Sequence, residues 1–242
     1  MPDGLQQYIK LENRLVLLAW LNSLFGYKSN RELLADCKSV AEGFGADRRS
    51  FLYHHLIARG SQVKVSAEKL AEYDENIRQH LEKINCGRME KITLRYFQYL
   101  AALYTEIVLD RLFNAQAQLL ADLNAFIAER NARRLPVEPQ GEPFTEDDLT
   151  KLAFWMATGS GKTLLLHLNY YQFLHYNREP LDNILLITPN EGLSEQHLRE
   201  LSASGIPAQR FDLNAGGLWS GSRDVCRSSK SPNWWRKSRA AT

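Results

Sequence analysis

Residues 151–163 read KLAFWMATGSGKT, and residues 164–188 continue as LLLHLNYYQFLHYNREPLDNILLIT. The short apolar run 151–156 is typical of a buried strand, and a loop with two glycines follows it directly. Residues 162–177 predict a helix, 183–188 predict a second buried strand, and 193–201 predict a second helix. A strand, a loop, a helix and a second strand in this order predict a right-handed parallel βαβ unit.

The loop after the first predicted strand has the composition of a phosphate-binding loop. It consists of Ala157, Thr158, Gly159, Ser160, Gly161, Lys162 and Thr163. Glycines allow the backbone to curl so that N–H groups face phosphate oxygens, and the start of the next helix adds a partial positive charge. We therefore expect Lys162 to contact the β- and γ-phosphates of ATP and the Thr163 hydroxyl to ligate Mg²⁺. The strict pattern begins with glycine where this chain has Met156, so a plain Gly-Ser turn is the alternative interpretation.

Two runs carry a family resemblance. AFWMATGSGKTLLLH (153–167) and ILLITPNEGLSEQHLREL (184–201) resemble the first two motifs of superfamily-two helicases, and more closely those of the DEAD/DEAH-like helicase (Res) subunit of type III restriction enzymes. A nonglycine residue opens the phosphate loop of that family, which fits Met156. The phrase YFQYLAALYTEIVLDRLF (96–113) is also similar to the family.

The resemblance implies both ligands and partners. It implies that residues 157–163 bind ATP and Mg²⁺ and that Thr188, Pro189 and Asn190 face single-stranded nucleic acid, with DNA as the expected form. It also implies a modification subunit as a partner. The scattered cysteines and the lack of a long apolar run or a signal pattern, rather than the resemblance, predict a cytoplasmic location with no role for a membrane. The position of residues 188–190 agrees with the implied nucleic-acid contact, because ligands of open parallel sheets bind at the carboxyl ends of the strands. A simple strand-to-helix turn is the alternative for these residues.

Residues 1–134 predict a helical domain, because no proline occurs between Pro2 and Pro136 and apolar residues recur at helical spacing. The apolar series Leu70, Tyr73, Ile77, Leu81 and Ile84 marks one face of a helix. Ser66 is a candidate N-cap of that helix, and Ser29 with Glu32 fits a capping box. Residues 93–133 predict either one very long helix or two helices joined near Asn114.

The fold class that follows is α + α/β. A helical domain (1–134) precedes a Pro-rich linker (135–150, LPVEPQGEPFTEDDLT) and the start of a RecA-like ATP-binding domain with a parallel sheet (151–222). An atypical basic tail (223–242) follows, and the RecA-like domain is incomplete. The chain thus has the organisation expected of the N-terminal part of a larger motor.

Hydrolysis of ATP in this class requires a carboxylate pair, Asp-Glu, at the end of an apolar strand. The acids after Thr163 are Glu179, Asp182, Glu191, Glu195, Glu200, Asp212 and Asp224, and none forms such a pair. Asp74 and Glu75 belong to a predicted amphipathic helix, where solvated charges are expected. We therefore assign no catalytic residue and expect a truncated helicase or translocase that binds ATP without hydrolysing it alone. The alternative is a helical partner-binding module with a vestigial nucleotide-binding half-domain.

Composition excludes disordered, fibrous and membrane-spanning classes. The 242 residues are 44% hydrophobic and 24% charged, and 30 basic against 28 acidic residues give a net charge of +2. Three scattered cysteines (Cys37, Cys86 and Cys226) predict reduced thiols, and the histidines show no metal-binding spacing with them.

The basic excess lies entirely in residues 223–242, which carry six basic residues and one acid. Two interpretations stay open for this tail. Trp234 and Trp235 among basic residues fit a tail that stacks on nucleic-acid bases. Alternatively, the tail is the product of a shifted reading frame, because one choice of codons for residues 226–237 gives a regularly patterned peptide in another frame.

Overall fold

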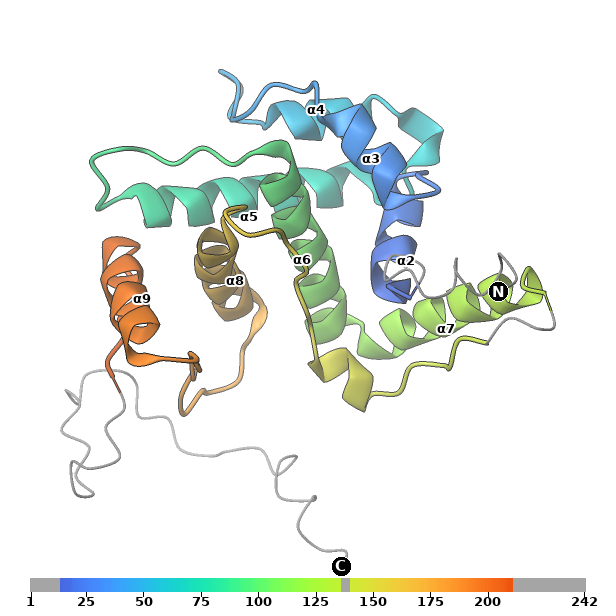
Figure 1. Ribbon diagram of the computed structural model, residues 1–242. Helices are drawn as coiled ribbons and strands as arrows, with labels where there is room; N and C mark the ends of the chain where they lie inside the picture. Colours follow the sequence, from blue (N-terminus) through green and yellow to red (C-terminus); the bar gives the residue numbers. More distant parts are fainter. Residues whose placement is uncertain (1–13, 136–139, 211–242) are drawn as a thin grey trace, which may run out of the picture.

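A computed structural model describes residues 14–135 and 140–210, and its ordered elements are helices (Figure 1). The tail 223–242 lies outside the described residues. The helices are α2 (Val16–Leu24), α3 (Asn30–Cys37), α4 (Phe51–Ile57), α5 (Ala67–Asn85), α6 (Tyr96–Asn114), α7 (Gln116–Ala132), α8 (Lys162–Tyr176) and α9 (Glu191–Ala203), with 3₁₀ turns η2 (Gly60–Gln62) and η3 (Asp147–Thr150).

Helix α6 is the centre of the fold. It is buried on most of its circumference, which explains why its sequence is apolar or uncharged over most of its length. Helix α5 packs against it with the predicted stripe, from Leu70 to Ile84, fully inside the core. Every helix in ranges 14–135 and 140–210 is too short or too polar to cross a membrane.

The region 93–133 forms two helices, as one of the two interpretations predicted. Ala115 has φ −154° and ψ 47°, which are not helical angles, so α6 ends at Asn114 and α7 begins at Gln116. The break lets α7 leave α6 at a steep angle and pack against α2 (Figure 1).

The predicted N-caps are formed. The Ser66 hydroxyl accepts a hydrogen bond from the Lys69 amide at 3.3 Å, and the Ser29 hydroxyl accepts one from the Glu32 amide at 3.2 Å. The Glu32 carboxylate, however, accepts from the Lys28 amide rather than from that of Ser29, so only half of a capping box is present.

Asp74 corrects an expectation from the sequence, because its carboxylate is buried rather than solvated. It accepts a 2.5 Å hydrogen bond from the Tyr99 hydroxyl and two longer ones from the Ser50 amide, and Arg49 lies 3.8 Å away. These partners satisfy the charge inside the core. Glu75, its neighbour, is half-buried and pairs with Arg78.

The described part of the predicted linker is fixed to α7 by two asparagines. Asn131 exchanges two hydrogen bonds with the backbone of Gly141, at 2.8 and 2.9 Å, and Asn124 exchanges two with that of Phe144, at 2.7 and 3.0 Å. Each side-chain amide thereby pairs with the backbone N–H and C=O of one linker residue, as a neighbouring strand would do. The domain boundary at 135–150 stays a prediction.

Helix α8 packs against α6 and α5 (Figure 1). Leu165 and Leu168 are buried in the same hydrophobic core as the helices before residue 134. The predicted helical region and the helix after the loop therefore share one core.

The two predicted strands are not formed in the residues that the structure describes. Neither 151–156 nor 183–188 takes part in a ladder, and the β-bridge among the described residues lies elsewhere, between Phe44 and Ser50. The side chains are also not buried: Trp155 is 82% exposed and Ile187 is 90% exposed. A strand persists only when neighbours accept its backbone hydrogen bonds and cover its apolar faces, and the described segments supply neither.

Candidate nucleotide-binding loop

The loop between residue 156 and α8 has the backbone that its glycines predict. Gly159 has φ +75° and Gly161 has φ +87°, both in the left-handed region where glycine carries no steric cost. The Ser160 amide and hydroxyl both donate to the carbonyl of Ala157, at 3.3 and 2.6 Å, which closes a tight turn that contains Gly159. Gly161 is the N-cap of α8, so the loop leads directly to the positive end of the helix dipole.

Lys162 turns its side chain back over the loop. Its ammonium donates to the carbonyls of Ala157 at 2.9 Å and Met156 at 3.3 Å, and the residue is exposed to solvent. Neutral carbonyls rather than a carboxylate hold this charge, so an anion at the mouth of the loop competes favourably for it. Thr163 follows in the first turn of α8 and is half-buried.

Gln98 of α6 holds the loop by a hydrogen bond to its backbone. Its side-chain amide donates to the carbonyl of Ser160 at 2.8 Å, and its side-chain oxygen accepts from the Arg95 amide at 3.0 Å. A Cβ atom at Gly161 would lie 2.3 Å from the Gln98 nitrogen. No sequence motif marks Gln98, and the family likeness of residues 96–113 is the only signal that includes it.

Glu106 anchors the far end of α8. Its buried carboxylate accepts hydrogen bonds from Tyr176 at 2.6 Å and Gln172 at 2.7 Å, both in α8, and from Asn76 of α5 at 3.0 Å. Burial raises the pKa of Glu106, and the three donors oppose that rise. Two aromatic residues after the loop are packing residues: Tyr176 belongs to this network, and Phe173 contacts Phe113 edge-on.

Ser204 connects α8 to α9 and to the turn after α5. Its hydroxyl bonds to His167 of α8 at 2.8 Å and accepts from Arg88 at 2.7 Å, and its carbonyl accepts from Tyr171 at 2.8 Å. Burial lowers the pKa of His167, which favours the neutral ring. These contacts fix the C-terminal end of α9 against the helix that follows the loop.

The second predicted motif forms the start of α9. The Asn190 side chain caps this helix by accepting from the Leu193 amide at 2.9 Å, and the Thr188 hydroxyl donates to the Asn190 carbonyl at 3.2 Å. Pro189 and Asn190 are exposed, and Thr188 is half-buried. Among the described residues, no hydrogen bond joins these three to the loop at 157–163.

Comparison with known proteins gives one family. A family model described as type III restriction enzyme, res subunit, matches residues 109–231, which is half of the chain and includes both motifs. No curated protein and no solved structure matches the chain.

Proposed function

The chain belongs to the type III restriction enzyme res-subunit family, and we propose that residues 157–163 bind ATP and Mg²⁺ as the nucleotide site of a helicase-type module. The observation that carries this proposal is the backbone of the loop. Two left-handed glycines lie immediately before α8, and an exposed lysine ammonium folds over the same loop. A plain Gly-Ser turn explains the glycines but gives no reason for the position of Lys162.

Each residue of the loop has a part in this proposal. The amides of Gly159, Gly161 and Lys162 donate to phosphate oxygens, assisted by the dipole of α8. Lys162 exchanges the carbonyls of Ala157 and Met156 for the β- and γ-phosphates. Thr163 supplies a hydroxyl ligand to the Mg²⁺ that neutralises the phosphates when the nucleotide binds.

We further propose that this chain does not hydrolyse ATP by itself. Of the acids that follow the loop, Glu191 is paired with Arg210 at 2.5 Å, and no two of them are adjacent in sequence. A water molecule at the γ-phosphate thus has no carboxylate pair to activate it. Hydrolysis and translocation would then require a carboxylate pair from elsewhere in the enzyme.

Residues 188–190 are proposed to contact single-stranded DNA, and a modification subunit is proposed as a partner of the whole enzyme. The exposure of Pro189 and Asn190 supports contact with a large ligand. Asn190 also caps α9, so its replacement would disturb the helix. Thr188→Ala is the cleaner variant, and fluorescence anisotropy with labelled single-stranded DNA and RNA of the same sequence tests both the contact and the preference.

A test of metal use separates the proposal from simple anion binding. We expect wild type to bind ATP more tightly with Mg²⁺ than with EDTA, and Thr163→Val to lose most of that difference. Thr93→Val removes an exposed threonine elsewhere and serves as the control. Equal binding by Thr163→Val and wild type in Mg²⁺ would contradict the assigned ligand.

The alternative of an independent helical partner-binding module is less favoured, because Leu165 and Leu168 of α8 lie in the common core. Removal of the residues after 134 would expose the face of α6 and α5 that α8 covers.

A further inference from the structure

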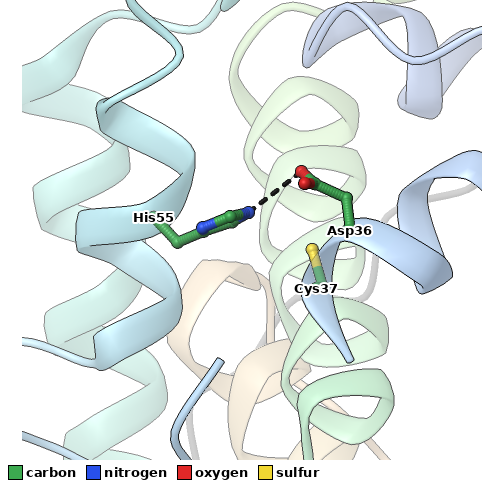
Figure 2. A group of neighbouring side chains, drawn as sticks. All are labelled: Asp36, Cys37 and His55. Carbon is green, nitrogen blue, oxygen red and sulfur yellow. Dashed lines mark hydrogen bonds and ion pairs between the residues drawn. The ribbon is translucent and has the colours of Figure 1, made fainter. Parts of the chain in front are cut away.

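Three side chains with metal-binding atoms meet between α3 and α4. Asp36 and Cys37 end α3, and His55 lies on the facing side of α4 (Figure 2). One ligand atom of each lies within 4.8 Å of the other two, and the His55 Nε2 atom is 2.9 Å from the Asp36 carboxylate. No sequence motif marks this group, because the separation of residues 37 and 55 along the chain fits no short metal-binding pattern.

The carboxylate of this group is held through one oxygen, Asp36 Oδ2, which also bonds to His55. Asp36 Oδ2 accepts from the Tyr27 hydroxyl at 2.5 Å and from the Arg59 guanidinium at 3.0 Å. Arg59 also lies over the Tyr27 ring, with its guanidinium carbon 3.9 Å from the ring centre. Ligating carboxylates are commonly oriented by such outer hydrogen bonds.

We propose that Asp36, Cys37 and His55 form a binding site for Zn²⁺. A thiolate, an imidazole and a carboxylate are all zinc ligands, and three protein ligands leave a fourth position for water. The side chains of Asp36 and His55 are 37% and 30% exposed, so the ion and its water reach the site from solvent. Cys37 is buried, which protects the sulfur from competing thiols and oxidants.

Zinc binding at this site rearranges few atoms. The Cys37 S–H bond breaks, a Zn–S bond forms, and the proton passes to solvent. His55 turns its Nε2 atom from Asp36 to the ion, while Tyr27 and Arg59 keep their bonds to the carboxylate. The two negative charges of Asp36 and the Cys37 thiolate balance the Zn²⁺, so the positive charge of Arg59 faces a neutral centre.

Occupation of the site joins α3 to α4. Across the group, the His55–Asp36 pair connects these two short helices, and the Arg59–Asp36 pair connects α3 to the residues just after α4. An ion that binds only the folded chain raises its melting temperature in proportion to the logarithm of ligand concentration. Zinc should therefore stabilise the full chain independently of any nucleotide.

The experiment uses the full chain. The protein is loaded with Zn²⁺, dialysed, and its zinc content measured by mass spectrometry, and a parallel sample is loaded with Co²⁺ to detect thiolate-to-cobalt absorption in the near ultraviolet. The site variants are Cys37→Ser and His55→Gln. The matched controls are His54→Gln, which alters the neighbouring histidine that pairs with Asp47, and Cys86→Ser/Cys226→Ser, which leaves Cys37 as the remaining thiol.

We expect one zinc per chain in wild type and both controls, a higher melting temperature with zinc, and thiolate absorption with cobalt. Cys37→Ser and His55→Gln should lose the bound ion. His55 is partly exposed, so its variant should keep the circular dichroism of wild type if the buried Cys37 variant fails to fold. Less than one zinc in wild type, loss of zinc in the double-cysteine control, or no thiolate absorption overturns the proposal.

Discussion

The side-chain amide of Gln98 donates a hydrogen bond of 2.8 Å to the carbonyl of Ser160, the residue between the two left-handed glycines of the loop. A carbonyl held by α6 cannot turn toward bound phosphates, which would repel it. The neighbouring amides then stay available to an anion. Helix α6 is therefore part of the support of the candidate nucleotide site, although it lies far from that site in sequence.

Replacement of Gln98 by Leu should weaken ATP binding without abolishing it. The variant removes two hydrogen bonds, the one to the Ser160 carbonyl and the one from the Arg95 amide at the start of α6. The bond to Ser160 is the one that acts on the loop, and its net contribution of about 0.5–1.5 kcal/mol corresponds to at most about a tenfold change in affinity. Gln79→Leu, which removes an exposed glutamine bonded to Glu75, is the control. Titration calorimetry with Mg-ATP measures the change, and identical affinities for both variants would argue against a role for Gln98.

Gly161→Ala should destabilise the fold more than Gly159→Ala. Both glycines have positive φ, so alanine costs about 1–2 kcal/mol at either position. At Gly161 the added Cβ also meets the Gln98 nitrogen at 2.3 Å, whereas no atom lies within 4 Å of one at Gly159. Urea unfolding measures the loss of unfolding free energy for each variant. We expect the additional loss for Gly161→Ala to disappear when Gln98 is also replaced by Ala. An additional loss that persists in that double variant would have another cause.

The buried carboxylate of Glu106 should make stability depend on pH. Its pKa is raised in the folded state, so the folded chain holds a proton in a pH range where the unfolded chain has already released it. The contribution to the unfolding free energy is complete below the unfolded pKa and is lost as pH rises through the folded pKa. The unfolding free energy of wild type, measured from unfolding curves at several pH values, should therefore fall with rising pH more steeply than that of Glu106→Gln in this range. The same pH dependence in both proteins would contradict the prediction.

The contribution of Glu75 to stability should depend on pH in the opposite direction. Its hydrogen bonds with Arg78 lower its pKa to about 2, so its stabilising contribution is present above the unfolded pKa of the side chain and is lost as pH falls toward about 2. In the same pH series, Glu75→Gln should reduce stability near neutrality and lose that effect in acid. A difference from wild type that stays constant down to pH 2 would show that the ion pair does not contribute.

Asn124→Ala should release the backbone around Phe144 from α7. The Phe144 amide donates to the Asn124 side chain at 2.7 Å, and the carbonyl accepts from it at 3.0 Å. Without these bonds, we expect hydrogen exchange at the Phe144 amide to become faster, while the Gly141 amide, which Asn131 holds, keeps its rate. Equal acceleration at both amides would indicate that the two asparagines act as one unit.

The sequence predicted the helices well because local signals and tertiary contacts agree there. The stripe from Leu70 to Ile84 is buried, the Ser66 cap is formed, and α8 begins at Lys162 as the loop pattern requires. The glycines of the loop predicted a tightly curled backbone for a local steric reason, and both positions have positive φ.

The remaining features depend on contacts between distant segments. Gln98 meets Ser160, and Asp74 is buried by Ser50 and Tyr99, but no periodicity records such pairs. The apolar runs 151–156 and 183–188 have the composition of strands, yet composition alone does not supply neighbouring strands. The group of Asp36, Cys37 and His55 likewise depends on a contact between two helices, which no local sequence pattern predicts.

The central claim is that Lys162 binds the phosphates of ATP, and the most direct test is calorimetric titration of the full chain with Mg-ATP. We predict saturable binding by wild type, loss of measurable binding by Lys162→Ala, and unchanged binding by Lys64→Ala, which removes an exposed lysine elsewhere. Circular dichroism should be the same for all three proteins. Binding by a folded Lys162→Ala variant with wild-type affinity, or no binding by wild type, would contradict the account.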